Sequence, residues 1–160
     1  MHMRDQEERR FAVTIKHDKN YQFVSQASED GRLHGEPFRS DEPDPVGDDA
    51  GPATPALLGT ALGHCLSASL LETLRRSRLD VRSLETEAVA VVKLGEEGLP
   101  RIDHVDIVLK PVLGEPSPRT ARAEDVFQNH CTVTCSVRKG IDVRVRVEWA
   151  YERQPAEPIA

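Results

Sequence analysis

The sequence lacks the features by which several common classes of protein are recognised. Aromatic residues make up only 4% of the chain and the formal net charge is −6, so neither a stacking platform for bases nor a basic face for phosphates is expected. It contains no glycine-rich phosphate loop, no Gly-x-Ser-x-Gly turn and no His-Glu-x-x-His motif. We therefore expect no nucleic-acid partner and none of these three kinds of site.

Cysteine is scarce as well, and the start of the chain does not resemble an export signal. The first ten residues, MHMRDQEERR, are charged and lack the apolar stretch of a signal peptide. The longest uncharged run, residues 50–71, contains two prolines and several small polar residues, which fits a buried helix better than a membrane span. These features predict a cytoplasmic protein with no membrane partner, in which three cysteines form no disulfide scaffold and any thiol bond is transient.

The spacing of the cysteine and histidine residues disfavours a metal site. His64–Cys65, His130–Cys131 and Cys135 give five candidate ligands, but no Cys-x-x-Cys pair occurs. Adjacent residues of a helix point about 100° apart, so His64 and Cys65 do not easily bind one ion. We expect neither a metal nor a cofactor.

The N-terminal part of the chain predicts strands followed by an acidic loop. Apolar residues alternate over 11–15 and again over 21–23, on either side of the turn-like HDKN, which is the pattern of a β-hairpin. EDGRLHG predicts a further turn and a short strand. Residues 36–53 are rich in proline and acidic residues and predict an exposed loop, either mobile or lying across a neighbouring surface.

A long buried helix is predicted from residue 54 to about residue 78, beginning with a threonine N-cap and a proline. Leucine, alanine and cysteine residues cover well over half of its circumference, which is typical of a helix in a core. Gly59, Gly63 and Ser67 form a stripe of small residues on one face. Such stripes let another backbone come close, so this one suggests a pair of helices.

The remainder predicts strands at 84–94 and 102–113, a shorter helix at 117–129 and a last strand at 141–149, with a frayed tail at 152–160. In the last strand apolar and charged residues alternate strictly.

The order of these elements predicts an α+β fold in which helices pack on an antiparallel sheet. A length of 160 residues fits a single domain over 1–160, with a core from about residue 11 to residue 150.

The three cysteines allow two interpretations from the residues alone. Cys65 lies in the middle of the long helix, Cys131 lies where the shorter helix is predicted to end, and Cys135 follows four residues later. Cysteine is among the most buried residue types and often packs as a small apolar residue. The alternative is that these thiols are held in place for chemistry.

No other group of residues points as clearly to catalysis. Asp103, His104 and Asp106 open a predicted strand and are expected to alternate between its faces. A solvated sheet edge explains them at least as well as an active site does.

The segment DEPDPVGDDAGPATPALLGTALGHCLSASLLETLRR and the later HCTVTCSVRKGIDVRVRVEW resemble the OsmC/Ohr family of thiol-dependent peroxidases. The resemblance covers roughly residues 11–150. In that family a long buried helix carries the peroxidatic cysteine, and a resolving cysteine ends a later helix. Cys65 matches the first position and Cys131 the second, whereas Cys135 has no counterpart and is expected to be a packing residue.

The resemblance implies an OsmC-like fold and an intertwined homodimer with its active sites at the subunit interface. It also implies that the Cys65 thiolate attacks an organic hydroperoxide, with hydrogen peroxide as an open second substrate. The resulting sulfenic acid condenses with Cys131 to a disulfide. An external dithiol then reduces that disulfide.

The chain departs from the peroxidase branches of this family at two positions. Those branches place a glutamate beside the proline that opens the helix, where this chain has Pro55 and Ala56. They also carry an active-site arginine early in the chain, but Lys19, Arg32 and Arg39 fall in no recognisable motif. We therefore expect a slow peroxidase, and the alternative is an OsmC-fold dimer that binds a small apolar or thiol-reactive molecule with little turnover.

Overall fold

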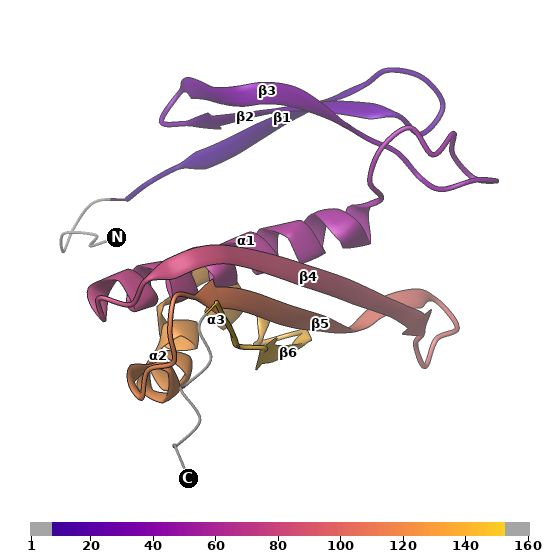
Figure 1. The fold of residues 1–160 in the computed structure, drawn as a ribbon. Coiled ribbons are helices and arrows are strands. Elements are labelled where there is room, and N and C mark those ends of the chain that lie inside the picture. The colour runs from indigo at the N-terminus through magenta and orange to yellow at the C-terminus, as the bar shows by residue number, and fades with distance from the viewer. Residues whose placement is uncertain (1–7, 153–160) are drawn as a thin grey trace, which may run out of the picture. The chain divides into compact units, whose positions relative to one another are not determined.

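The structure, a computed structural model, describes residues 8–152 and divides at Thr54 into two compact units (Figure 1). The first unit contains three strands and an acidic loop, and the second contains three helices, a short 3-10 helix and four strands. The fold is therefore mixed α+β, as predicted, but with two sheets instead of one. Most of the predicted tail, residues 153–160, lies outside the described residues.

The first unit is an antiparallel sheet in the order β1 (Phe11–His17), β2 (Phe23–Glu29) and β3 (Arg32–Ser40). Asp30 and Gly31 join β2 to β3 with φ angles of 48° and 82°, the pair of positive values that a tight two-residue hairpin turn requires. The predicted hairpin of the first two strands is confirmed, because β1 and β2 pair antiparallel. The third strand is longer than expected and continues through residues 36–40, which the sequence predicts as part of the loop.

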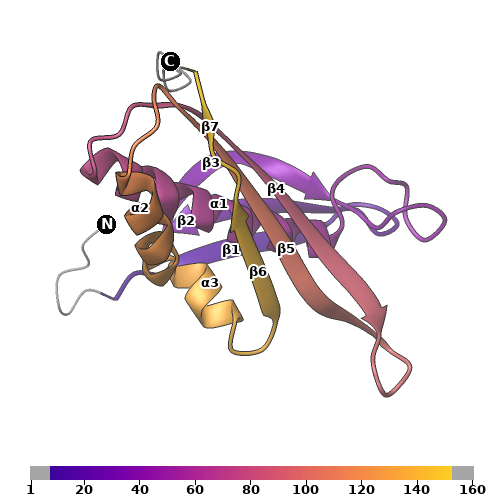
Figure 2. The same cartoon turned by 60° about the horizontal axis from the view of Figure 1, so that its bottom comes forward.

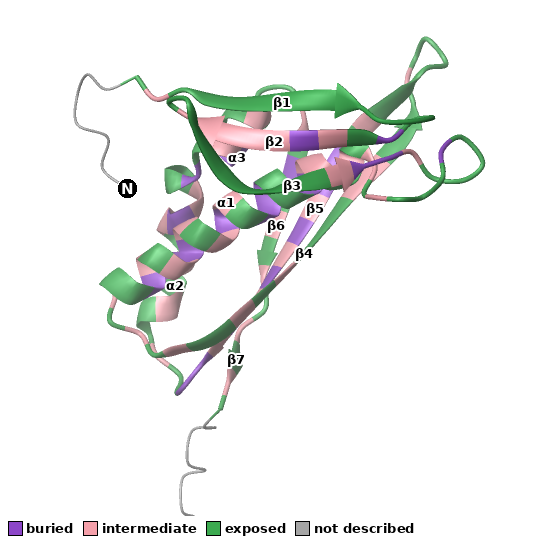
Figure 3. Ribbon diagram, turned by 90° about the horizontal axis from the view of Figure 1, so that it is seen from above, coloured by how far each residue is buried: buried purple, intermediate pink, exposed green. Residues whose placement is uncertain are grey.

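One face of this sheet carries apolar side chains that the chain leaves exposed. Phe11, Val13 and Ile15 alternate along β1 and are 69%, 54% and 62% exposed, and Figure 3 shows β1 as exposed along its length. The strand register places Phe23 and Phe38 on the same face. A sheet face of this composition is typical of a surface that is covered in an assembly.

The loop after β3 begins at Asp41, not at residue 36, because the residues before it pair with β2. It is organised around the Asp41 carboxylate, which is almost fully buried and accepts hydrogen bonds from the backbone N–H groups of Glu42 (2.8 Å), Asp48 (3.0 Å) and Ala50 (3.0 Å). Burial by itself would raise the pKa of Asp41, but these three donors outweigh it and lower that pKa. The acidic segment is thus organised around one buried carboxylate.

Helix α1 (Thr54–Arg76) opens the second unit and supplies much of its core. Four leucines at intervals of four residues are completely buried: Leu62, Leu66, Leu70 and Leu74. Burial of each leucine side chain stabilises the folded state by about 1.5–3 kcal/mol relative to leaving it exposed. Although α1 is long and apolar enough to cross a membrane, these leucines pack in the core of the unit, as in a core helix.

Helix α1 ends two residues earlier than the sequence suggested. Arg78 takes a left-handed conformation, with a φ of 56°, and the N–H of Leu79 donates back to the carbonyl oxygen of Leu74 (3.0 Å). This is the geometry of a helix C-cap.

The second sheet has the strand order β4 (Val81–Leu94), β5 (Pro100–Leu113) and β6 (Asp142–Val147), with β7 (Ala150–Tyr151) also paired to β5 (Figure 2). The β4–β5 hairpin is antiparallel, but β6 and β7 run parallel to β5. The prediction of an antiparallel sheet was therefore wrong for its last strands. The cause is the helical connection between β5 and β6, which returns the chain to the end of the sheet where β5 began.

That connection consists of α2 (Arg119–Phe127), the 3-10 helix η1 (Gln128–His130) and α3 (Thr132–Val137). The sequence predicted a single helix over 117–129 and missed α3. Helix α3 has only six residues, and most of them are β-branched, a composition with low intrinsic helix propensity.

The stripe of small residues on α1 packs against strand β4 of the same chain. A Cβ built on Gly59 or Gly63 would meet the side chain of Ala88 at 3.5 Å and 3.7 Å, and the Ser67 hydroxyl lies 2.6 Å from the hydroxyl of Thr86. The stripe therefore fits a helix onto a sheet, and the interpretation of it as a contact between two helices was wrong.

This packing predicts that Gly63→Ala stabilises the protein. The new methyl group would lie 3.5 Å from Cγ2 of Thr86, an ordinary contact, and alanine is favoured over glycine inside a helix by about 0.5–1 kcal/mol. We expect the free energy of unfolding in urea to rise by about that amount. Gly47→Ala is the matched control and should destabilise the protein, because its Cβ would collide with the carbonyl oxygen of Glu42. A loss of stability in Gly63→Ala would contradict the observed packing.

Candidate active site

Helix α1 holds Cys65 at the edge of the core of the second unit. The side chain is half-buried and packs against the buried apolar cluster, three residues after Leu62 and one before Leu66. Its neighbour His64 is exposed, as expected for adjacent residues that point in different directions from a helix. Cys65 is thus a core-facing thiol that solvent still reaches.

Cys131 comes to the same place from the other end of the second unit. It is the N-cap residue of α3, with an extended backbone (φ −86°, ψ 99°), and its side chain is completely buried. Its Sγ lies 3.0 Å from the hydroxyl oxygen of Thr134, which is also buried. The thiol of Cys65, packed against the same apolar cluster, is near enough to raise the pKa of Cys131. Two cysteines that are 66 positions apart in sequence therefore lie side by side.

The surroundings of Cys131 disfavour its thiolate. Burial is the main cause that raises the pKa of Cys131, and the neighbouring Cys65 thiol raises it further. The hydroxyl of Thr134 acts in the opposite direction because it can donate a hydrogen bond to the thiolate. Cys131 is therefore a protonated thiol at neutral pH, with one hydroxyl placed to assist its ionisation.

Thr134 is a site residue that the sequence reasoning missed. It follows Cys131 by three residues, which is the spacing between an N-cap residue and the third residue of a helix. That spacing was a usable signal, but it depends on recognising that a helix begins after Cys131.

Cys135 lies on the exposed side of α3, and the expectation that it packs in the core was wrong. Its backbone N–H donates to the carbonyl oxygen of Cys131 (3.0 Å), so the two cysteines are one helical turn apart. Its thiol donates to the carbonyl oxygen of Gln128 at 3.4 Å.

The peroxidase branches of the family carry a glutamate at the start of the long helix and an arginine early in the chain. In this structure the first is missing, and the candidate for the second is paired within the first unit. No acidic residue occurs in the first turn of α1. In the first unit, the Arg39 guanidinium contacts a carboxylate oxygen of Asp18 (2.6 Å) and the side-chain oxygen of Gln22 (2.7 Å), and the hydrogen bond from Arg39 lowers the pKa of Asp18. Lys19 and Arg32 are exposed.

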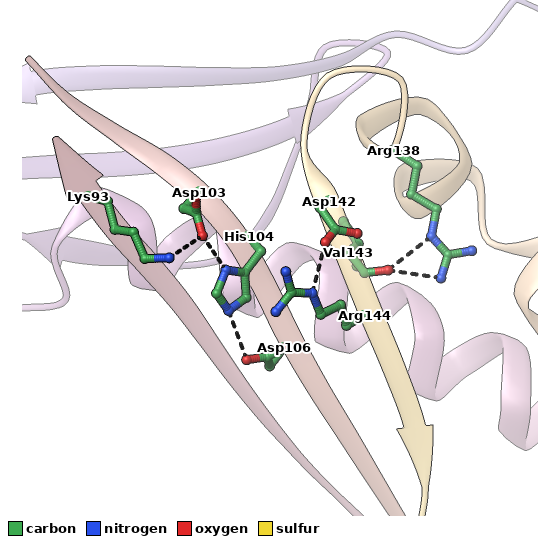
Figure 4. A network of polar contacts seen from close by, with 8 residues as sticks. All are labelled: Lys93, Asp103, His104, Asp106, Arg138, Asp142, Val143 and Arg144. Atoms are coloured by element: carbon green, nitrogen blue, oxygen red, sulfur yellow. Dashed lines mark hydrogen bonds and ion pairs between the residues drawn. The ribbon is translucent and has the colours of Figure 1, made fainter. Parts of the chain in front are cut away.

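The Asp103–His104–Asp106 group forms a polar network on β5 (Figure 4). A bulge opposite Val91 and Val92 leaves Asp103 unpaired, and the buried His104 ring contacts carboxylate oxygens of Asp103 (2.7 Å) and Asp106 (3.1 Å). The hydrogen bond from Lys93, followed by that from His104, lowers the pKa of Asp103. The bulge brings together side chains that were expected on alternate faces.

The residues of this network do not form a metal site. A hollow of about 330 Å³ lies beside it, lined by residues 106–108 of β5 and 144–146 of β6. Within residues 8–152, no group of three or more histidine, cysteine or acidic side chains is arranged to hold a metal ion. The paired thiols of Cys65 and Cys131 are thus the strongest candidate for chemistry.

The two sheets, the three helices and the architecture that pairs the thiols define an α+β protein of the OsmC-like class. A family model described as OsmC-like protein matches residues 47–146, and the chain belongs to this family. Comparison with curated protein sequences gives no match.

Solved structures with the same fold include an OsmC-like protein of unknown function from Vibrio cholerae, which is 18% identical with a TM-score of 0.67 over 89% of this chain and 100% of that one. An OsmC-like protein from Mycoplasma pneumoniae is 11% identical, with a TM-score of 0.68 over 91% and 99%. The organic hydroperoxide resistance protein OhrB of Bacillus subtilis is 14% identical, with a TM-score of 0.57 over 87% and 98%.

Proposed function

We propose that this chain is a thiol-dependent peroxidase that reduces organic hydroperoxides, with Cys65 as the peroxidatic and Cys131 as the resolving cysteine. The observation that carries this proposal is that the two cysteines, one half-buried and one fully buried, meet in the same apolar cluster of the second unit. Family membership supports the choice of oxidant, because similar structures include proteins named for organic hydroperoxide resistance.

The first step oxidises Cys65. Its thiolate attacks the terminal oxygen of the hydroperoxide, the O–O bond breaks, and the remaining alkoxide takes up a proton and leaves as an alcohol. Cys65 becomes a sulfenic acid. Access from solvent suits Cys65 to this step, since Cys131 is completely buried.

The second step forms a disulfide. The Cys131 sulfur attacks the sulfur of the Cys65 sulfenic acid, the S–O bond breaks, and hydroxide leaves and is protonated to water. An external dithiol then reduces the disulfide by two successive exchanges and is itself oxidised to a disulfide. Because both cysteines belong to one apolar cluster, the chain does not have to bring together distant parts of the second unit for this step.

The raised pKa of Cys131 predicts a pH dependence for the second step. Because the reactive form is the thiolate, disulfide formation should accelerate about tenfold per pH unit until the pH exceeds the pKa of Cys131. Thr134→Val removes the hydroxyl that assists ionisation and should slow this step roughly three- to tenfold near neutral pH.

Rapid-quench alkylation of protein mixed with one equivalent of cumene hydroperoxide measures this rate. Thr132→Val, at an exposed position of the same short helix, is the matched control and should leave the rate unchanged. Equal rates in Thr134→Val and the unmodified protein would remove Thr134 from the site.

The missing charges favour slow turnover. The first turn of α1 has no acid to orient a substrate, and Arg39 is already bound to Asp18 and Gln22. The specific alternative, a binding protein with little turnover, rests on the same two observations.

We also propose that the chain is a homodimer. The support is the apolar sheet face of the first unit, on which Phe11, Val13 and Ile15 are each more than half exposed. Light scattering after gel filtration should give about twice the chain mass of 17.8 kDa. Phe11→Lys and Ile15→Lys should shift the protein toward the monomer, while Thr14→Lys on the opposite face should not. An unmodified protein that is monomeric at micromolar concentration would contradict the dimer.

The proposed function is tested by mixing the protein with cumene hydroperoxide and a tenfold excess of a small dithiol. We expect repeated turnover, with one dithiol oxidised per hydroperoxide reduced to its alcohol. Consumption that stops after one equivalent per chain, or does not occur, would favour the binding protein.

A further inference from the structure

We propose that Cys135 is a relay thiol, which takes over the disulfide formed between Cys65 and Cys131 and presents it at the surface to the reductant. The inference rests on the proposed function and adds a third cysteine to its cycle. It assigns a role to the one cysteine that the two-thiol chemistry does not use.

The relay answers a difficulty of access. Reduction of a disulfide begins with attack of an external thiolate on one of its sulfurs, so that sulfur must be reachable along the line of the S–S bond. Cys131 is 0% exposed, and Cys65 is half-buried against the core, open to small molecules from solvent but not fully exposed. A small dithiol can enter such a site more easily than the dithiol of a reducing protein. Cys135, in contrast, is exposed.

The backbone places Cys135 within reach of Cys131. The hydrogen bond from the N–H of Cys135 to the carbonyl oxygen of Cys131 (3.0 Å) keeps the two residues within one turn of chain. A disulfide needs a Cβ separation of about 3.5–4.5 Å. The first turn of α3 therefore has to rearrange to bring the two Cβ atoms to this separation, and the six-residue length of the helix limits the structure that such a change disturbs.

The side chain of Cys135 also points toward the segment that leads into Cys131. Its Sγ contacts the carbonyl oxygens of Gln128 (3.4 Å) and Asn129 (3.9 Å), both in the 3-10 helix just before Cys131. The buried thiol of Cys131 and the exposed thiol of Cys135 thus belong to one short, continuous segment of chain.

The exchange step is balanced within the protein. The Cys135 thiolate attacks Sγ of Cys131, a Cys131–Cys135 bond forms, and the Cys65–Cys131 bond breaks. Cys65 leaves as a thiolate, and the proton given up by Cys135 restores the charge balance. Burial raises the pKa of Cys131 and makes it a poor leaving group, which favours this direction over attack on Cys65. Cys65 is then free for the next hydroperoxide, and the external dithiol reduces Cys131–Cys135.

The test follows the position of the disulfide after the fully reduced protein meets one equivalent of cumene hydroperoxide. Samples are quenched in acid at intervals, free thiols are alkylated, and peptides are mapped by mass spectrometry. Trypsin leaves Cys131 and Cys135 in one peptide, residues 123–138. The relay predicts that the Cys65-linked form appears first and then declines, while an internally bridged 123–138 peptide rises and Cys65 becomes alkylatable again.

Cys135→Ser should keep the Cys65–Cys131 link in place and slow turnover with a thioredoxin-type protein dithiol about tenfold, with a smaller effect when the reductant is a small dithiol. Ser136→Ala, its neighbour on the exposed side of α3, is the matched control and should not change turnover. A Cys65–Cys131 link that persists in the unmodified protein, or a Cys135→Ser chain with normal turnover on the protein dithiol, would overturn the relay.

Oxidation with diamide, which makes disulfides without a peroxide, separates the two proposals. Transfer of the bridge to Cys135 after diamide, combined with no reaction toward cumene hydroperoxide, would support the relay and overturn the peroxidase. Normal oxidation of Cys65 by the hydroperoxide without transfer would overturn the relay alone.

Discussion

Replacing Cys65 by serine is expected to lower the consumption of cumene hydroperoxide in the presence of a small dithiol by roughly a hundredfold or more. A serine hydroxyl is nearly the same size as the thiol but is not ionised near neutral pH and cannot pass through a sulfenic acid. The half-buried position next to the core should accept the change without unfolding. The initial rate of hydroperoxide loss, followed by a dye that reports residual peroxide, measures the effect.

Thr60→Ser, on the exposed side of the same helix, is the control and should retain the rate of the unmodified protein. Circular dichroism of both variants shows whether the fold is kept. A folded Cys65→Ser chain that still turns over hydroperoxide at a normal rate would remove Cys65 from the chemistry.

Replacing Phe127 by alanine is expected to lower the free energy of unfolding by about 3–5 kcal/mol. Phe127 is completely buried and ends α2, directly before the turn that leads to Cys131. The cavity left by the ring removes packing contacts that the short helices cannot replace by collapsing. Urea unfolding followed by circular dichroism measures the change.

Leu99→Ala, at the β4–β5 hairpin, is the control because that side chain is half exposed, and its effect should stay within about 1 kcal/mol. The Phe127→Ala chain should also form the Cys65–Cys131 disulfide more slowly, since the support of Cys131 is weakened. Equal and small effects for both substitutions would show that α2 contributes little to the core.

The parts of the fold that could be predicted from the sequence are those with a strong local pattern. Alternation of apolar residues gave β1 and the start of β2. Apolar residues around more than half of the circumference gave α1, and Thr54 and Pro55 gave its start. The alternation of the last strand is also confirmed, because Val143 is buried and Val145 and Val147 are half-buried, whereas the charged residues between them are exposed. In each case the residue pattern and the tertiary packing favour the same structure.

The predictions that were wrong concern elements for which packing or topology overrides the local residue pattern. The residues at the start of α3, Thr132, Val133 and Thr134, have low helix propensity. They are nevertheless helical because the chain has to return from the end of β5 to the start of the parallel strand β6. The direction of β6 is set by this connection, and the residue pattern of β6 itself does not indicate it. The partner of Gly59 and Gly63 could not be read from the stripe either, since small residues favour close approach by a helix or by a strand.

For the candidate site, the roles of Cys65 and Cys131 came from the family resemblance. The residue patterns alone did not distinguish a reactive thiol from a packing residue at either position. Their proximity depends on Cys131 joining the apolar cluster that the leucines of α1 help to form, directly before α3, a helix that the sequence did not predict. The exposure of Cys135 has the same origin, because its place on the outer side of α3 is defined only once that helix exists.

The measurement that tests the central claim most directly is the fate of the two thiols after a single turnover. In a Cys135→Ser chain, where the bridge has no third cysteine to move to, one equivalent of cumene hydroperoxide should link Cys65 to Cys131 and release one equivalent of alcohol. The yield of linked peptide should follow the amount of hydroperoxide up to one per chain. If both cysteines stay alkylatable while the hydroperoxide persists, the contact between Cys65 and Cys131 is structural and the chain is not a peroxidase.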